Sequence, residues 1–261
     1  MARYSNQKVG RLQNLHNLYN DNKDYLDFLV KNNVYITKEE LGNTNPLDTE
    51  VLNKSVDWGK INIDYNENKF VVVDNFLDAE FIERLRDFVL YFNLRHDYYT
   101  DYAALNFTPN ELWFPILSNI VKETKEKLPF LSKLDIERAW AFIYNQESYG
   151  VDIHADPGPT PNSANLNFWA TPNESVIDEA ETNGLYIWNT EPPSDWDYYD
   201  KNFKPDEVRD FLISTKKDPV KIDYGYNRAV FFNSLFYHKS QPVKTLPGYE
   251  NKRINYTFMF R

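Results

Sequence analysis

The pattern of apolar and polar positions changes near residue 67 and divides the chain into two parts. Residues 1–66 are polar and rich in asparagine, with apolar residues at helical spacing. This pattern predicts one or two short amphipathic helices followed by an irregular stretch. We expect residues 1–66 to form a helical extension packed on a main domain of residues 67–261. A separate partner-binding arm is the alternative.

The main domain is expected to begin with a buried strand and two helices. Residues 70–73 form a short apolar run typical of a buried strand. Asp78 is placed to cap a helix whose apolar residues recur on one face through residue 92. A second helix is predicted over about residues 110–127. We expect both helices to brace one side of a sheet.

From about residue 135 onward the pattern is mostly that of β-strands. Asn165, Asn167 and Trp169 alternate with apolar residues, so they should share one face of a strand. Helices followed by strands favour an α+β fold, with a double-stranded β-helix (jelly roll) braced by helices. The strands are predicted over residues 138–144, 165–171, 184–188, 228–234 and 253–260.

A long acidic and aromatic segment, residues 190–226, interrupts the predicted strands. The segment is predicted to contain one short helix, since Pro205 suits the first turn of a helix ending near residue 212. Long insertions between strands often act as lids or binding loops. A packed surface excursion is the equally weighted alternative.

Composition narrows the class of protein. The chain has no cysteine, which excludes disulfides, thiolate metal sites, iron–sulfur clusters and cysteine nucleophiles. Its formal net charge is −10, which makes nucleic acid a poor partner. No apolar run is long enough to span a bilayer, and the first residues lack an apolar signal core. We therefore expect a cytoplasmic protein with no membrane partner; the pattern leaves its oligomeric state open.

Two of the four histidines stand in an arrangement that suits a metal. His154 and Asp156 are two residues apart, so on a strand both side chains point to the same face. His238 is expected to end strand 228–234 after a short turn, where it would meet the first pair. Two imidazoles and one carboxylate are the facial ligand set that holds iron(II) in non-haem sites. His16 and His96, by contrast, are expected to be solvent-facing or structural.

Arg253 is the first residue of the last predicted strand, residues 253–260. Every second residue of this strand, beginning at residue 254, is apolar. A buried arginine is costly unless an anion accompanies it. One interpretation is an internal salt bridge with one of the many carboxylates of the chain. The other is a planar fork for the distal carboxylate of a dicarboxylate co-substrate.

Taken together, these features resemble the 2-oxoglutarate- and Fe(II)-dependent dioxygenase superfamily. The resemblance covers roughly residues 67–261, and its first part is similar to the prolyl-hydroxylase-like pattern of two tyrosines before His-x-Asp. Three stretches, residues 167–172, 227–234 and 248–255, resemble a bacterial and phage-type branch of the superfamily. The matching residues are Tyr144, Tyr149, His154, Asp156, His238 and Arg253.

The resemblance implies a role for each matching residue. The two histidines and the aspartate would hold Fe(II), and Arg253 would bind the C5 carboxylate of 2-oxoglutarate. Tyr144 would add a hydroxyl to that carboxylate. Asn255 stands where many members carry a small hydroxyl residue two positions after the arginine, and Asn167 is a candidate pocket residue.

The activity implied is hydroxylation of a C–H bond with O2, releasing succinate and CO2. The substrate would be a small molecule or a peptide: a peptidyl side chain, an amino acid or a small metabolite. Two alternatives remain. A cupin-like jelly-roll metalloenzyme would use the same ligands without 2-oxoglutarate, and a non-catalytic binding module would keep only the fold.

Overall fold

The computed structural model describes residues 50–91, 97–107, 115–156, 163–177 and 179–261. The helices predicted before residue 50 and both His16 and His96 lie outside the described residues. Residues 50–66 are not separate from the main domain, because Val51, Leu52 and Trp58 are buried in its main core. The division of the chain at residue 66 stays a prediction.

A large antiparallel sheet forms the centre of the molecule. In the described part of the chain it contains seven strands in the order β1-β9-β6-β12-β4-β3-β2. Strands distant in sequence are neighbours: β12 lies between β4 and β6. The strands are β1 (Phe70–Val73), β2 (Asp97–Tyr98), β3 (Tyr102–Phe107), β4 (Ile136–Tyr144), β6 (Ala164–Trp169), β9 (Ala229–Asn233) and β12 (Ile254–Phe260).

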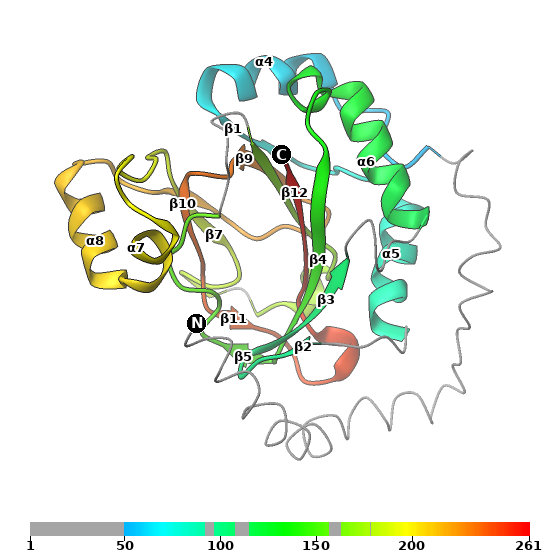
Figure 1. Ribbon diagram of the computed structural model, residues 1–261. Helices are drawn as coiled ribbons and strands as arrows, with labels where there is room; N and C mark the ends of the chain where they lie inside the picture. The colour runs from blue at the N-terminus through cyan, green and yellow to red at the C-terminus, as the bar shows by residue number, and fades with distance from the viewer. Residues whose placement is uncertain (1–49, 92–96, 108–114, 157–162, 178) are drawn as a thin grey trace.

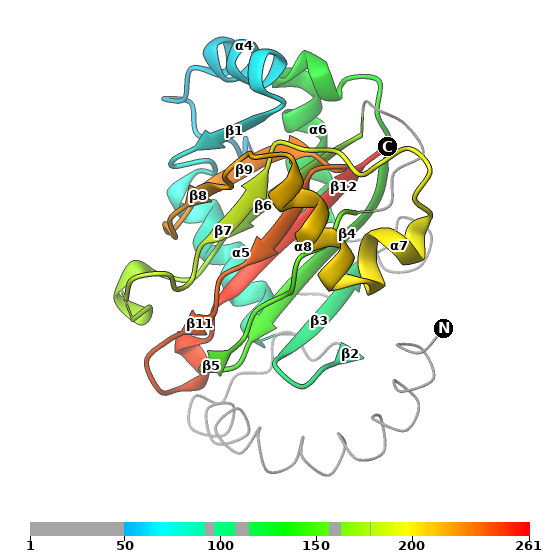
Figure 2. The same cartoon turned by 90° about the vertical axis from the view of Figure 1, so that its left-hand side faces the viewer.

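A smaller sheet faces the large one and completes the jelly roll (Figures 1 and 2). Its order is β10-β7-β8, and a two-stranded pair of β11 and β5 extends the same layer. The expectation of an α+β jelly roll is therefore confirmed. The strands of this layer are β5 (Glu147–Ser148), β7 (Leu185–Trp188), β8 (Val220–Ile222), β10 (Tyr237–Ser240) and β11 (Val243–Lys244).

Helices cover the outer faces of the two sheets (Figure 1). Three helices, α4 (Trp58–Asn68), α5 (Ala79–Tyr91) and α6 (Pro115–Lys127), enclose the main core against the large sheet. Asp78 caps α5, since its Oδ1 accepts hydrogen bonds from the next turn, as predicted. Two further helices, α7 (Tyr198–Phe203) and α8 (Pro205–Ser214), lie outside the small sheet. No helix in the described ranges combines the length and the apolar character needed to cross a membrane.

The alternation predicted for the strands separates the core from the interior of the jelly roll. One set of side chains packs into the main core under the helices: Leu166, Phe168, Tyr256 and Phe258. The other set faces the small sheet: Asn165, Asn167, Trp169, Arg253, Asn255 and Thr257. Trp169 illustrates this orientation, because it packs with Leu185 and Ile187 of β7.

Two expectations need correction. His238 does not end the strand of residues 228–234; a turn at residues 234–236 carries the chain into β10, a strand of the small sheet. The segment 190–226 is also not one insertion, because its last part contains β8, which pairs with β7. Both errors arise because short strands separated by tight turns leave no clear break in the apolar pattern.

Candidate metal and co-substrate site

Three side chains distant in sequence meet at one end of the jelly roll. One potential ligand atom from each of His154, Asp156 and His238 lies within 4.8 Å of the others. The Nε2 atom of His238 is 3.6 Å from Asp156 Oδ2, and that of His154 is 4.0 Å from Asp156 Oδ1. The structure thus brings together the residues that the sequence selected.

Backbone pairing of residues 154–156 with residues 234–238 sets this convergence. His154 and His238 form an antiparallel bridge, with N···O distances of 3.1 and 2.9 Å in the two directions. The backbone N–H of Asp156 donates to the carbonyl of Ser234 at 3.1 Å. The segment carrying the first two ligands is therefore held at both ends by the turn and strand that carry the third.

The Nδ1 atom of each imidazole forms a hydrogen bond with a backbone carbonyl. His154 Nδ1 lies 2.7 Å from the carbonyl of Asp152, and His238 Nδ1 lies 3.0 Å from that of Phe236. A carbonyl only accepts, so Nδ1 carries a proton in each ring, which leaves Nε2 as the atom that can bind a metal. Burial lowers the pKa of His238 to about 4, and His154 contributes to the lowering. The imidazole is neutral at physiological pH, as a metal ligand must be.

Asn165 is a site residue that the sequence did not select. Its side-chain amide, on β6, donates a hydrogen bond to Oδ2 of Asp156. Asn165 is fully buried, and its Oδ1 has no hydrogen-bond partner among the described residues. The sequence held one signal for Asn165, because it shares a predicted strand face with the candidate Asn167.

Arg253 is buried deep in the interior, on the same side of the large sheet. Only 1% of the residue is exposed, and its guanidinium carbon lies 4.9, 5.6 and 5.9 Å from the ring centroids of Tyr144, Trp169 and Tyr224. Within the described ranges no carboxylate pairs with it, and Nε and Nη1 have no hydrogen-bond partner. Burial lowers the pKa of Arg253, while Tyr144 and Tyr224 oppose the lowering. The internal salt bridge considered from the sequence is not present in this part of the chain.

Neighbouring groups hold Arg253 in place and add one unused donor. Thr171 accepts a hydrogen bond from the N–H of Ile254 and donates to the carbonyl of Lys252, which fixes the start of β12. The indole Nε1 of Trp169 is buried and has no acceptor among the described residues. The sequence placed Trp169 only on the strand face that it shares with Asn165 and Asn167. Trp169 lies beside Arg253, so its N–H is a second donor without a partner at this position.

The remaining two candidates lie between the metal-site residues and Arg253. Asn167 pairs in register with Thr257, and its Oδ1 also lacks a partner within the described residues. Asn255 donates from its side-chain amide to Thr257 Oγ1 at 3.1 Å. Both residues face the interior and are less than a tenth exposed. Their roles stay predictions.

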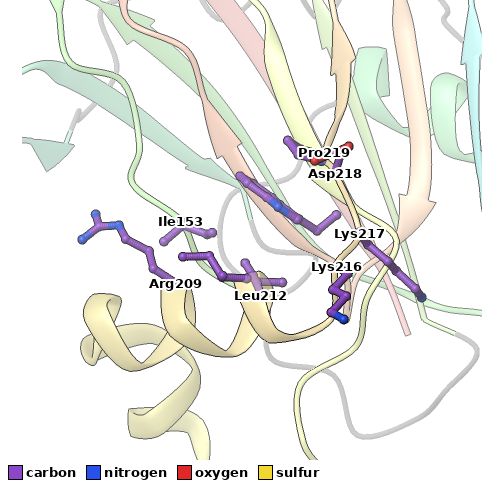
Figure 3. Close-up of a pocket in the computed structure, with 9 residues that line it drawn as sticks. Ile153, Arg209, Leu212, Lys216, Lys217, Asp218 and Pro219 are labelled. Atoms are coloured by element: carbon purple, nitrogen blue, oxygen red, sulfur yellow. The ribbon is translucent and has the colours of Figure 1, made fainter.

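A cavity of about 410 Å³ lies on the outer side of the small sheet, away from the metal-site side chains (Figure 3). Leu212 of α8 packs there against Ile153, the residue before His154. Val208 and Leu212 of α8 share a buried cluster with Ala155 and Tyr237. Segment 190–226 therefore includes a helix that packs behind the metal-site residues, in keeping with the packed alternative. The cavity is lined by Ile153, Trp188, Arg209, Leu212, Ile213, Lys216, Lys217, Asp218 and Pro219.

Comparisons with known proteins place this fold in a known class. No protein-family model and no curated protein sequence matches the chain. Among solved structures, it is similar to SnoN, a non-heme alpha ketoglutarate dependent epimerase from nogalamycin biosynthesis, with 11% identity and a TM-score of 0.57 over 78% of this chain and 82% of that one. SnoN has also been solved in complex with Fe3+, alpha ketoglutarate and nogalamycin RO.

Two prolyl hydroxylases show the same likeness. A Pseudomonas putida prolyl-4-hydroxylase matches with 11% identity and a TM-score of 0.52, covering 78% of this chain and 98% of that one. A Trichoplax adhaerens prolyl hydroxylase, in complex with a hypoxia inducible factor peptide fragment, matches with 14% identity and a TM-score of 0.51 over 78% and 88%. The chain therefore has the fold of the 2-oxoglutarate- and Fe(II)-dependent oxygenases.

Proposed function

We propose that this protein is a 2-oxoglutarate- and Fe(II)-dependent oxygenase that hydroxylates a C–H bond of a small-molecule or peptide substrate. One observation carries the proposal. A His-Asp-His cluster and a buried guanidinium that no carboxylate of the described residues pairs with face the same interior. The fold alone would fit a binding module equally well, but a module has no need of either feature.

The residues of the cluster suit iron(II). His154 and His238 would each offer Nε2, and Asp156 one carboxylate oxygen, which is the facial ligand set of non-haem iron oxygenases. The backbone carbonyls on the Nδ1 atoms and the Asn165 amide on the carboxylate supply the outer hydrogen bonds that orient such ligands.

The surroundings of Arg253 suit the distal carboxylate of 2-oxoglutarate. A buried cation without an anion is costly, and a carboxylate would satisfy the guanidinium through paired hydrogen bonds. The unused indole N–H of Trp169 would donate to the same carboxylate, and Tyr144 would close the other side. A cupin-like enzyme that does not use 2-oxoglutarate leaves this buried cation unexplained.

Iron and 2-oxoglutarate, when bound, would activate O2, with one oxygen atom going to the hydroxylated substrate and the other to succinate, and with CO2 released. The chain itself orients the co-substrate through Arg253 and excludes water with the rings around it. Relatives of this fold were solved with both kinds of substrate: SnoN with nogalamycin RO and the Trichoplax enzyme with a peptide.

The experiment is co-substrate turnover without a prime substrate. The protein with Fe(II), ascorbate and 2-oxoglutarate is expected to form succinate slowly, and His154→Ala is expected to form none. Calorimetric titration with Fe(II) under anaerobic conditions should show one site in the native chain and a much weaker one in His154→Ala. An iron-loaded protein that makes no more succinate than the variant would refute the proposal.

A further inference from the structure

Along β4, side chains facing the small sheet form an aromatic ladder between two arginines. Trp140 stacks on Phe142 with ring centroids 6.2 Å apart, and Phe142 lies 6.5 Å from Tyr144. Arg253 lies over Tyr144 at one end, and the guanidinium carbon of Arg138 lies 5.4 Å from the Trp140 ring at the other. From residue 138 to residue 144 the ladder spans roughly 20 Å at the rise of a strand.

The Arg138 end of this ladder is the end at which the His-Asp-His cluster lies. Met259 of β12 pairs with Arg138 on one side and with Asn165 on the other. Asn165 in turn donates to Asp156. Two strand spacings separate the backbones of residues 138 and 165, which is about 10 Å. Arg138 is therefore a close neighbour of the candidate metal site, at the opposite end of the interior from Arg253.

Arg138 carries a charge that nothing in the described part of the chain compensates. Its Nε is buried without a hydrogen-bond partner, and within the described ranges no carboxylate forms an ion pair with it. Arg261, the other arginine near the cluster, differs because Glu137 Oε2 lies 3.2 Å from its Nε. A half-buried cation held over an indole and left without an anion marks a position for a ligand anion.

We propose that the prime substrate carries an oxyanion, a carboxylate or a phosphate, which Arg138 binds through its planar fork. This assignment rests on the proposed oxygenase function and names the substrate class of the same site. With its anion at Arg138, the substrate extends across the roughly 10 Å that separate the backbones of residues 138 and 165. Trp140 packs against the apolar part of the substrate. The co-substrate carboxylate takes Arg253, so each arginine of the ladder serves a different molecule.

The test uses the protein loaded with Ni(II) and 2-oxoglutarate, which keeps Arg253 occupied and prevents turnover. Calorimetric titrations with inorganic phosphate, with propionate and with neutral propionamide separate phosphate recognition, carboxylate recognition and simple apolar binding. At least one anion is expected to bind and the amide is not. Arg138→Gln should weaken the anion at least about tenfold.

Two further variants make the result specific. Arg84→Gln removes the same charge from α5, on the far face of the large sheet, and is expected to bind as the native chain does. Arg138→Lys keeps the charge without the fork and should recover part of the affinity. Recovery in Arg138→Lys would also show that the loss in Arg138→Gln is not caused by misfolding. Thermal unfolding of each variant measures the folding directly.

Equal anion affinity in Arg138→Gln and the native chain overturns the proposal, and so does propionamide binding as tightly as the anions. Binding of neither anion to the native chain overturns it as well. The oxygenase function is scored separately, by iron-dependent succinate formation without prime substrate. That measurement uses only the native chain and His154→Ala, so failure of one hypothesis leaves the other measurable.

Discussion

The amide of Asn165 holds one oxygen of the Asp156 carboxylate, and both residues are largely withdrawn from solvent. Asn165 belongs to β6 of the large sheet, whereas Asp156 follows the segment that pairs with the small sheet. This hydrogen bond therefore ties the two layers together at the candidate metal site. The other oxygen, Oδ1, lies 4.0 Å from Nε2 of His154.

Replacing Asn165 with alanine is expected to weaken metal binding by about 10- to 100-fold, the usual cost of removing a group that orients a ligand. Asn167→Ala is the matched control, because it removes the same side chain from the same strand face two residues further on. Metal titration by calorimetry measures both variants. Equal metal affinity in Asn165→Ala and the native chain would mean that backbone pairing alone positions Asp156.

Much of this arrangement could be predicted from sequence because alternation in a strand fixes which face each residue takes. The faces predicted for residues 165–171 and 253–260 hold, and they carry Asn167 and Arg253 into the interior. The convergence of His154 with His238 follows from backbone pairing between distant strands. Sequence spacing alone could only suggest it.

Other features of the site depend on contacts that no local pattern encodes. The link from Asn165 to Asp156 joins β6 of the large sheet to a segment that pairs with the small sheet. The place of Arg138 depends on the register of β4 against β12, which sets Met259 between it and Asn165. The strand β8 was missed because it has only three residues, and β10 was missed because only a short turn separates it from β9.

Arg253→Gln is expected to raise the KM for 2-oxoglutarate by more than about tenfold, because it removes the cation that binds the distal carboxylate. The metal affinity is expected to stay unchanged, because the guanidinium lies beside Tyr144 and apart from the ligand cluster. Trp169→Phe keeps an aromatic ring and removes only the N–H, so a smaller rise, up to about tenfold, is expected. Succinate formation at varied 2-oxoglutarate measures both. If Trp169→Phe leaves the KM unchanged, its indole does not contact the co-substrate.

Asp152 contacts His154 through its backbone and Arg209 through its side chain, and a substitution can separate the two contributions. Its carbonyl accepts from His154 Nδ1, while its carboxylate forms an exposed ion pair with Arg209, with both side chains about half exposed. Exposed pairs contribute little, so Asp152→Asn should lower the free energy of unfolding by less than about 1 kcal/mol and leave metal affinity unchanged. Thermal unfolding and metal titration check this. A clear loss of metal affinity would show that the carboxylate, through Arg209, positions the imidazole.

Leu212 and Ile213 are adjacent on α8 but lie in opposite environments. Leu212 is buried in the cluster that contains Ile153 and Ala155, whereas Ile213 is 75% exposed. Leu212→Ala should lower the free energy of unfolding by about 2–5 kcal/mol, because it opens a cavity behind the metal-site segment. Ile213→Ala should change it by less than about 0.5 kcal/mol.

The same pair of variants shows whether α8 supports the metal site. At a temperature where Leu212→Ala remains folded, its metal affinity is expected to fall several-fold, because the residues on either side of His154 lose their packing partner. Ile213→Ala should bind metal as the native chain does. Denaturant unfolding of the metal-free protein and calorimetric metal titration separate the two effects. A destabilised Leu212→Ala with native metal affinity would mean that the bridge between His154 and His238 holds the ligands without help from the helix.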